Sequence, residues 1–183
     1  MGTAQPDVPD AIDQIVGQWA EQAPDLDVSA MQVLGRLHRS YLKYQAALNV
    51  LFDRHGINTA SFDVLAALRR GGPPYRMTAG QLAASSMVTT GGITMRLDRL
   101  ERAGLAIRER DAQDRRIVYA QLTDAGLRVV DETARAHFAN EARMLAELSP
   151  EERRQLAVLL RKLEHSLDVN VVGNGSGDLS PAR

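Results

Sequence analysis

The sequence contains no cysteine among its 183 residues. This absence excludes disulfide bonds, thiolate metal sites and thiol-based redox sensing. Aromatic residues make up only 4% of the chain and helix-forming residues are abundant, so an all-β fold is not expected. No apolar run approaches the ~20 residues that cross a bilayer, and residues 1–7 lack a basic region followed by an apolar one. We therefore expect a cytoplasmic protein with no membrane partner.

The net charge of -1 hides a strong polarisation along the chain. Residues 69–116 contain ten arginines and five acidic residues, a local charge of +5. The other twelve basic and eighteen acidic residues carry a charge of -6. A basic segment within an acidic body is typical of a protein that orients on a phosphate backbone without adhering to it everywhere.

The basic segment contains two short predicted helices. Thr78 is a capping residue at the start of residues 78–84, residues 85–88 are typical of a turn, and residues 89–103 resume helical periodicity. Gly104 ends the second helix. Two helices joined by about four residues favour a helix-turn-helix, whose second helix enters the DNA major groove.

A hairpin is predicted directly after these helices. Residues 105–110 and 116–122 have strand character, and residues 111–114 are typical of a turn. Arg115 and Arg116 lie at the tip, where two guanidinium groups can reach a narrow, electronegative minor groove. The pattern predicts a mainly α fold with a small β-hairpin wing, a winged helix-turn-helix that binds double-stranded DNA. Taken alone, an Arg-Arg pair is more often solvated surface.

Long helices are predicted on both sides of this unit. Asp10 is a capping residue for a helix bounded by Pro24, and an apolar stripe runs from Met31 to Leu51. Ser149 opens a capping box for a leucine-rich last helix. The stripes exceed what one small domain buries, so we expect a homodimer on a palindromic operator, with a monomeric helical bundle as the alternative. The predicted parts are an N-terminal extension (1–27), a first dimerisation helix (28–57), a DNA-binding lobe (58–122), C-terminal dimerisation helices (123–168) and a disordered tail (169–183).

The hairpin also carries a spaced motif. Asp114-Arg115-Arg116, then five residues, then Leu122-Thr123 resembles the wing signature of the MarR family of winged-helix regulators, and the helix order agrees over residues 28–167. The resemblance implies a transcriptional regulator whose wing Arg116 enters the minor groove. It also implies that the second helix faces bases or phosphates with Thr89, Thr90, Gly91 and Thr94.

The second helix departs from the family pattern at two positions. Arg96 stands where an apolar residue is typical, and Met95 stands where a DNA-contacting arginine is frequent. On a helical wheel, Ile93, Leu97 and Leu100 centre the buried face, and Arg96 lies on its flank. A half-buried guanidinium needs an anion, either a carboxylate of the protein or a ligand.

Segments 62–65, 72–76 and 140–143, together with the added N-terminal helix, resemble the urate-responsive branch of the MarR family. This resemblance implies that a small-molecule effector, urate, xanthine or a similar planar anion, binds at four residues and releases the DNA. Trp19 and Arg96 would hold the purine, Asp63 would be repelled by it, and Arg108 would relay the shift. Urate is a flat monoanion near neutral pH, which suits an indole for stacking and a guanidinium for paired hydrogen bonds. We expect a repressor.

Each of these residues also has a structural interpretation. Trp19 can be a hydrophobic anchor, Asp63 a first-turn acid favoured by the helix dipole, Arg96 a permanent ion-pair partner of Asp63, and Arg108 an exposed strand residue. The functional alternatives are a ligand-independent architectural DNA binder and a regulator of a different aromatic anion.

An enzyme would need a catalytic constellation, and none is recognisable. Residues 90–92 (Thr-Gly-Gly) could be a phosphate-binding turn, but they lack a P-loop lysine and a preceding strand. The four histidines lie on separate predicted elements, so neither a metal site nor a cofactor is expected.

Overall fold

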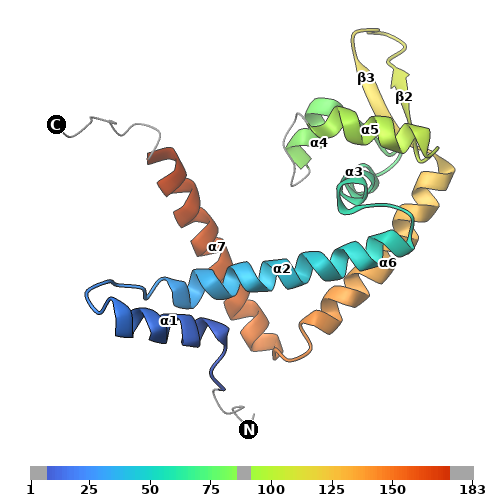
Figure 1. Cartoon of the computed structure of the whole chain (residues 1–183). Helices are drawn as coiled ribbons and strands as arrows, with labels where there is room; N and C mark the ends of the chain where they lie inside the picture. Colours follow the sequence, from blue (N-terminus) through green and yellow to red (C-terminus); the bar gives the residue numbers. More distant parts are fainter. Residues whose placement is uncertain (1–7, 86–91, 174–183) are drawn as a thin grey trace. The chain divides into compact units, whose positions relative to one another are not determined.

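The computed structural model describes residues 8–85 and 92–173. Its elements, in chain order, are α1 (Ala11–Gln22), α2 (Met31–Arg54), α3 (Thr59–Arg70), β1 (Arg76–Thr78), α4 (Ala79–Ser85), α5 (Ile93–Arg102), β2 (Ala106–Arg110), β3 (Val118–Leu122), α6 (Asp124–Met144) and α7 (Pro150–Gly173) (Figure 1). The chain divides into two compact units, Met1–Ala134 and Arg135–Arg183, so that α6 crosses the division. None of the described helices is long and apolar enough to span a membrane.

The described strands form an antiparallel sheet in the order β1-β3-β2. β2 and β3 are the predicted hairpin, with Arg108 opposite Ala120, whereas β1 was not predicted and pairs Arg76 with Gln121. The fold class is confirmed as mainly helical with a small wing sheet, and the hairpin gains a third strand. A three-residue strand has too little sequence for a period-2 pattern, and its stability comes from pairing with β3, some 40 residues away.

The core of the first unit lies where α3, α5 and the sheet meet. Four residues of α3 are completely buried, Val64, Leu65, Ala67 and Leu68. α5 adds Ile93, Leu97 and Leu100, and the sheet adds Ala106, Ala120 and Leu122. These side chains fix α5 and the wing on one common core.

Side-chain caps define where most helices begin. Asp10 and Asp13 form the capping box of α1, and Ser149 and Glu152 exchange the equivalent bonds at α7. Both caps were predicted, because capping chemistry is local in sequence. At α3 the sequence favours Thr59 as the capping residue, but the side chain of Asn58 accepts the Ser61 N–H at 2.8 Å, so Asn58 is the cap.

Two helix ends differ from the prediction. The sequence predicts a helix from Thr123 to about Leu148, but α6 ends at Met144, and α7 continues to Gly173. Residues 169–173 are therefore helical, although a disordered tail was predicted from residue 169, because no glycine or proline interrupts the sequence before Gly173. The rest of that tail lies outside the described residues.

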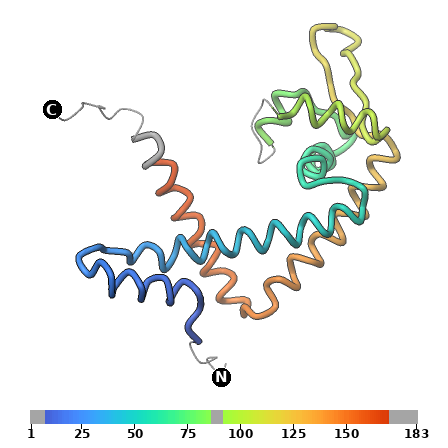
Figure 2. The backbone as a smooth tube through the Cα atoms, viewed as in Figure 1, coloured from blue at the N-terminus to red at the C-terminus, as the bar shows by residue number. Residues whose placement is uncertain are grey.

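The added helix α1 lies alongside α2 (Figure 2). Ile12 is 3% exposed, and its Cδ1 would be 2.8 Å from a Cβ placed on Gly35, so the missing side chain of Gly35 makes room for it. Arg36 of α2 binds two carboxylates of α1, with 3.0 Å from Nε to Oδ2 of Asp10 and 2.7 Å from Nη2 to Oδ1 of Asp13. The apolar contact of Ile12 and the ion pairs of Arg36, called the Arg36 clamp below, together hold α1 on α2.

Candidate DNA interface and effector pocket

α5 has a buried face and an exposed face. Ile93, Leu97 and Leu100 are buried, which confirms the wheel drawn from the sequence. Thr94 and Met95 are exposed on the opposite side. In a winged helix-turn-helix this solvent face is the one available to the major groove. Thr94 is therefore on the predicted side, while the other predicted contacts at residues 89–91 (Thr89, Thr90 and Gly91) lie outside the described residues.

Two aspartates shape the tip of the wing. Oδ1 of Asp111 accepts the backbone N–H groups of Gln113 and Asp114 at 2.8 and 2.9 Å, and Oδ1 of Asp114 accepts the Arg116 N–H at 3.0 Å. The N–H groups of Asp114 and Gln113 hold the pKa of the Asp111 carboxyl below its ordinary value. The tip is thus a loop of paired Asx turns that extends through Ile117, longer than the predicted turn at 111–114.

Arg115 and Arg116 are both exposed on this loop, as predicted. Neither lies in a strand, although Arg116 was expected to begin β3. Because the turn hydrogen bonds fix the backbone from Asp111 to Arg116, the two side chains project from an ordered tip. An exposed pair of guanidinium groups on such a tip suits contact with phosphates or a narrow minor groove.

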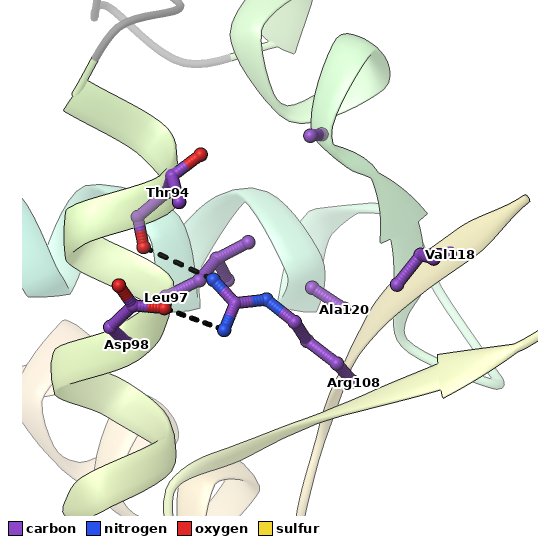
Figure 3. A pocket seen from close by; sticks show the side chains of 7 residues that line it. Thr94, Leu97, Asp98, Arg108, Val118 and Ala120 are labelled. Carbon is purple, nitrogen blue, oxygen red and sulfur yellow. Dashed lines mark hydrogen bonds and ion pairs between the residues drawn. The ribbon is translucent and has the colours of Figure 1, made fainter.

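Arg108 joins the wing to α5. Its Nη1 lies 2.6 Å from Oδ1 of Asp98, and its Nη2 donates to the Thr94 carbonyl oxygen at 3.1 Å (Figure 3). Its Nη1 also pairs with Glu101. Its side chain is 29% exposed. Arg108 lies in β2, but the alternative of an exposed strand residue is wrong, because its side chain is partly covered and three groups of α5 bind its guanidinium.

A small pocket opens beside this arginine, between α5 and the sheet (Figure 3). Its volume is ≈ 280 Å³, and its lining comes from Ala79, Thr94, Leu97, Asp98, Arg108, Val118 and Ala120. Of the four predicted effector residues, only Arg108 lines it. The pocket therefore differs from the predicted purine site, and the guanidinium at its wall is already neutralised by carboxylates of the chain.

Arg96 is half-buried, as the wheel predicted. Its side chain turns back toward the beginning of α5, where a Cβ on Gly92 would lie 3.4 Å from Nε. Its Nη1 is buried and has no hydrogen-bond partner within residues 8–85 and 92–173. A buried N–H of a charged group without an acceptor is costly, and the positive end of the helix dipole lies beside it. An anion that accepted this N–H group would therefore be stabilised beside Arg96.

The other two predicted effector residues lie on neighbouring helices. Asp63 is half-buried on α3, which packs against α5. Trp19 lies on α1, which packs on α2, and α2 packs in turn on α3. The indole is 44% exposed, so Ile12 and not Trp19 is the hydrophobic anchor of α1. An exposed, rigid aromatic ring is available to a ligand or to a second chain.

Sequence reasoning missed several residues that build these arrangements. Arg36 was not considered, although it holds α1 in place. Asp98 and Glu101 were not recognised as the partners of Arg108. Their spacing in the sequence carries no signal, because the pairing crosses from a helix to a strand.

Comparison with known proteins decides the family. The MarR family model matches residues 55–117, and the transcriptional regulator PecS of Dickeya dadantii is 39% identical over 156 residues, covering 85% of this chain and 94% of PecS. The chain belongs to the MarR family. It is a transcriptional regulator of the MarR/PecS type that binds DNA, and its similarity to PecS places it in the PecS-like branch of the family.

Solved structures agree with this assignment. The chain is 27% identical to a MarR variant from E. coli complexed with operator DNA, with a TM-score of 0.64 and coverage of 75% of this chain and 99% of that one. It is 26% identical to BpsR of Bordetella bronchiseptica, with a TM-score of 0.65 and coverage of 74% and 94%. DNA binding by BpsR is regulated by 6-hydroxynicotinic acid.

Proposed function

We propose that this protein is a homodimeric repressor that binds a palindromic operator and is released by urate or a related planar purine anion. The observation that carries the ligand proposal is Nη1 of Arg96, buried and without a hydrogen-bond acceptor in the described chain. An anionic heterocycle supplies that acceptor and compensates the charge.

The positions of the other predicted residues support the same proposal. Asp63 is half-buried on α3, the helix that packs against the helix of Arg96, so we infer that a purine anion at Arg96 would approach its negative charge. That repulsion disfavours the ligand unless α3 and α5 shift. A ligand that prefers the shifted state weakens DNA binding by the same factor, with a typical coupling of ~1 to 3 kcal/mol.

A different aromatic anion is the second candidate effector. The regulator of DNA binding by BpsR, 6-hydroxynicotinic acid, is also a flat heterocyclic acid. Both chemistries need a guanidinium and a stacking surface, so urate, xanthine and 6-hydroxynicotinic acid should be compared on the same protein.

Exposed apolar side chains support the homodimer. In the first unit, α2 exposes Val33, Leu34, Tyr41 and Leu42; in the second unit, α7 exposes Leu156, Leu159, Leu160 and Leu167. Monomeric proteins rarely leave such a row of large apolar side chains uncovered along a helix. A twofold partner would cover both surfaces and present two α5 helices to a palindrome. Sedimentation of the full chain across concentrations tests this point.

The effector test compares two arginine variants. We expect Arg96→Ala to lose the urate response while keeping most operator affinity, because its guanidinium carries the buried N–H group that lacks an acceptor. Arg116→Ala should lose operator affinity, whereas Arg128→Ala, which removes the same charge from an exposed position of α6, should change it little. Quenching of Trp19, the only tryptophan, reports ligand binding directly. Operator affinity that stays constant up to millimolar concentrations of each purine would refute effector release and favour a ligand-independent DNA binder.

A further inference from the structure

The exposed face of α5 carries one large apolar side chain. Met95 is 73% exposed and lies directly opposite the buried residues Ile93, Leu97 and Leu100. A methionine on this face makes no contribution to the core. A water-exposed thioether adds little to the stability of the free protein, so a substitution at Met95 can change binding without changing the fold.

Further along the exposed side of α5, Met95 is followed by one acidic residue, Asp98, whose carboxylate pairs with Arg108, and by two cationic residues. Arg99 and Arg102 are four and seven residues further along, which places them on the same side of α5 as Met95. Both are exposed. An apolar tip bordered by two guanidinium groups matches the major groove, where base edges lie between two rows of phosphates.

The major groove offers one apolar group, the C5-methyl of thymine. An arginine at the same position would donate to the O6 and N7 acceptors of guanine instead. Methionine is flexible and polarisable, so it can adapt to a methyl group without a fixed hydrogen-bond geometry. We propose that Met95 is a specificity-determining residue that reads a thymine methyl group in each half of the operator.

This inference rests on the proposed operator-binding mode, in which α5 enters the major groove. Arg99 and Arg102 supply affinity by contacting phosphates, and Met95 supplies discrimination between bases. Thr94, exposed one residue earlier, lies on the flank of the same face and is held from behind by its carbonyl contact with Arg108. The wing clamp therefore fixes the part of α5 from which Met95 projects.

The experiment removes the methyl group from DNA rather than from the protein. An operator is first selected from random DNA with the full-length protein, and each thymine is then replaced in turn by deoxyuridine, which keeps every hydrogen-bonding group. We expect a loss of about fourfold in affinity at one thymine per half-site, the effect of one methyl group leaving an apolar contact. The other thymines should tolerate the replacement.

Two variants of similar size provide the matched controls. Met95→Leu keeps an apolar tip and should retain the deoxyuridine penalty, whereas Met95→Gln has nearly the same length and should lose it. Met95→Arg should select guanine at the same position. Wild-type protein that tolerates deoxyuridine throughout its footprint, or a penalty that persists unchanged in Met95→Gln, would overturn the inference. Failure to select any specific sequence would instead overturn the proposed function itself.

Discussion

Two junctions in the first unit use the same charged device. Where α1 meets α2, Arg36 holds Asp10 and Asp13; where β2 meets α5, Arg108 holds Asp98 and Glu101. In both cases one guanidinium binds two carboxylates that lie on, or directly before, the preceding helix. The surroundings of the two clamps nevertheless differ, and so do their consequences.

The difference lies in how much apolar surface each junction buries. α1 has a single buried residue, Ile12, and the Arg36 side chain is 37% exposed, whereas α5 has three buried residues and the Arg108 side chain is 29% exposed. Apolar burial stabilises by more than partly exposed ion pairs do. α5 is therefore held by the core and only oriented by Arg108, while α1 depends on one side chain and its clamp. The helix that carries Trp19 can then open without unfolding the lobe.

The largest expected effect is at the apolar side of the α5 junction. Leu97→Ala should lower the free energy of unfolding of the DNA-binding lobe by about 2 to 5 kcal/mol, because it leaves a cavity beneath a packed helix. Denaturant unfolding measures the change. Met95→Ala on the exposed face of the same helix is the control and should stay within about 0.5 kcal/mol. Equal losses in both variants would show that α5 is not held by its buried face.

The same kind of change at the other junction should have a local effect. Ile12→Ala should cost the docking of α1 about 2 kcal/mol, the value of one buried aliphatic side chain. We expect a red-shifted Trp19 emission and faster proteolysis after α1, with the denaturant midpoint of the lobe unchanged. Gln18→Ala, on an exposed position of α1, serves as the control. A fall in the lobe's own stability would mean that α1 is part of its core.

Removing the Arg108 clamp should affect DNA binding more than folding. Arg108→Met leaves Asp98 and Glu101 uncompensated beside the DNA-facing surface, so operator affinity should fall by about three- to tenfold through repulsion of phosphates. The stability change should be about 1 kcal/mol or less, as for other partly exposed pairs. Adding Asp98→Asn should restore part of the affinity in a double-mutant cycle. No restoration would indicate that Arg108 itself contacts phosphate.

The sequence could predict an interaction only where the residues that make it lie close together in the chain. The caps at Asp10 and Ser149 and the half-burial of Arg96 depend on residues within two helical turns, and the structure confirms them. Strand β1 depends on β3, and the bonds of Arg108 depend on how a strand crosses a helix. No local pattern encodes these contacts.

Trp19 marks the limit of periodicity arguments. Helical spacing places it on the same side of α1 as Ile12, and both were expected to be apolar contacts. The structure buries Ile12 against Gly35 and leaves Trp19 44% exposed. Periodicity identifies which side of a helix is apolar, but it does not show how many residues along that side the neighbouring helix buries.

The smallest expected effect is the pH dependence of the α1 clamp. The hydrogen bond from Arg36, followed by that from the Asp10 backbone N–H, holds the pKa of the Asp13 carboxyl below its ordinary value of about 4. A carboxyl whose folded pKa is lowered stabilises the docked state fully above its ordinary pKa, and this contribution fades as the pH falls through the folded pKa. Trp19 emission should therefore report constant docking from pH 8 to about pH 5 and a loss only below about pH 4.

The Asp13→Asn variant isolates that contribution. It should dock α1 more weakly than wild type at neutral pH and show less change on acidification, because one of the two carboxylates that pair with Arg36 is gone. Asp25→Asn, an exposed aspartate in the segment after α1, should behave like wild type. A docking transition between pH 6 and 7 would indicate that a histidine controls the docking of α1. The Arg36 clamp would then not be what holds α1 on α2.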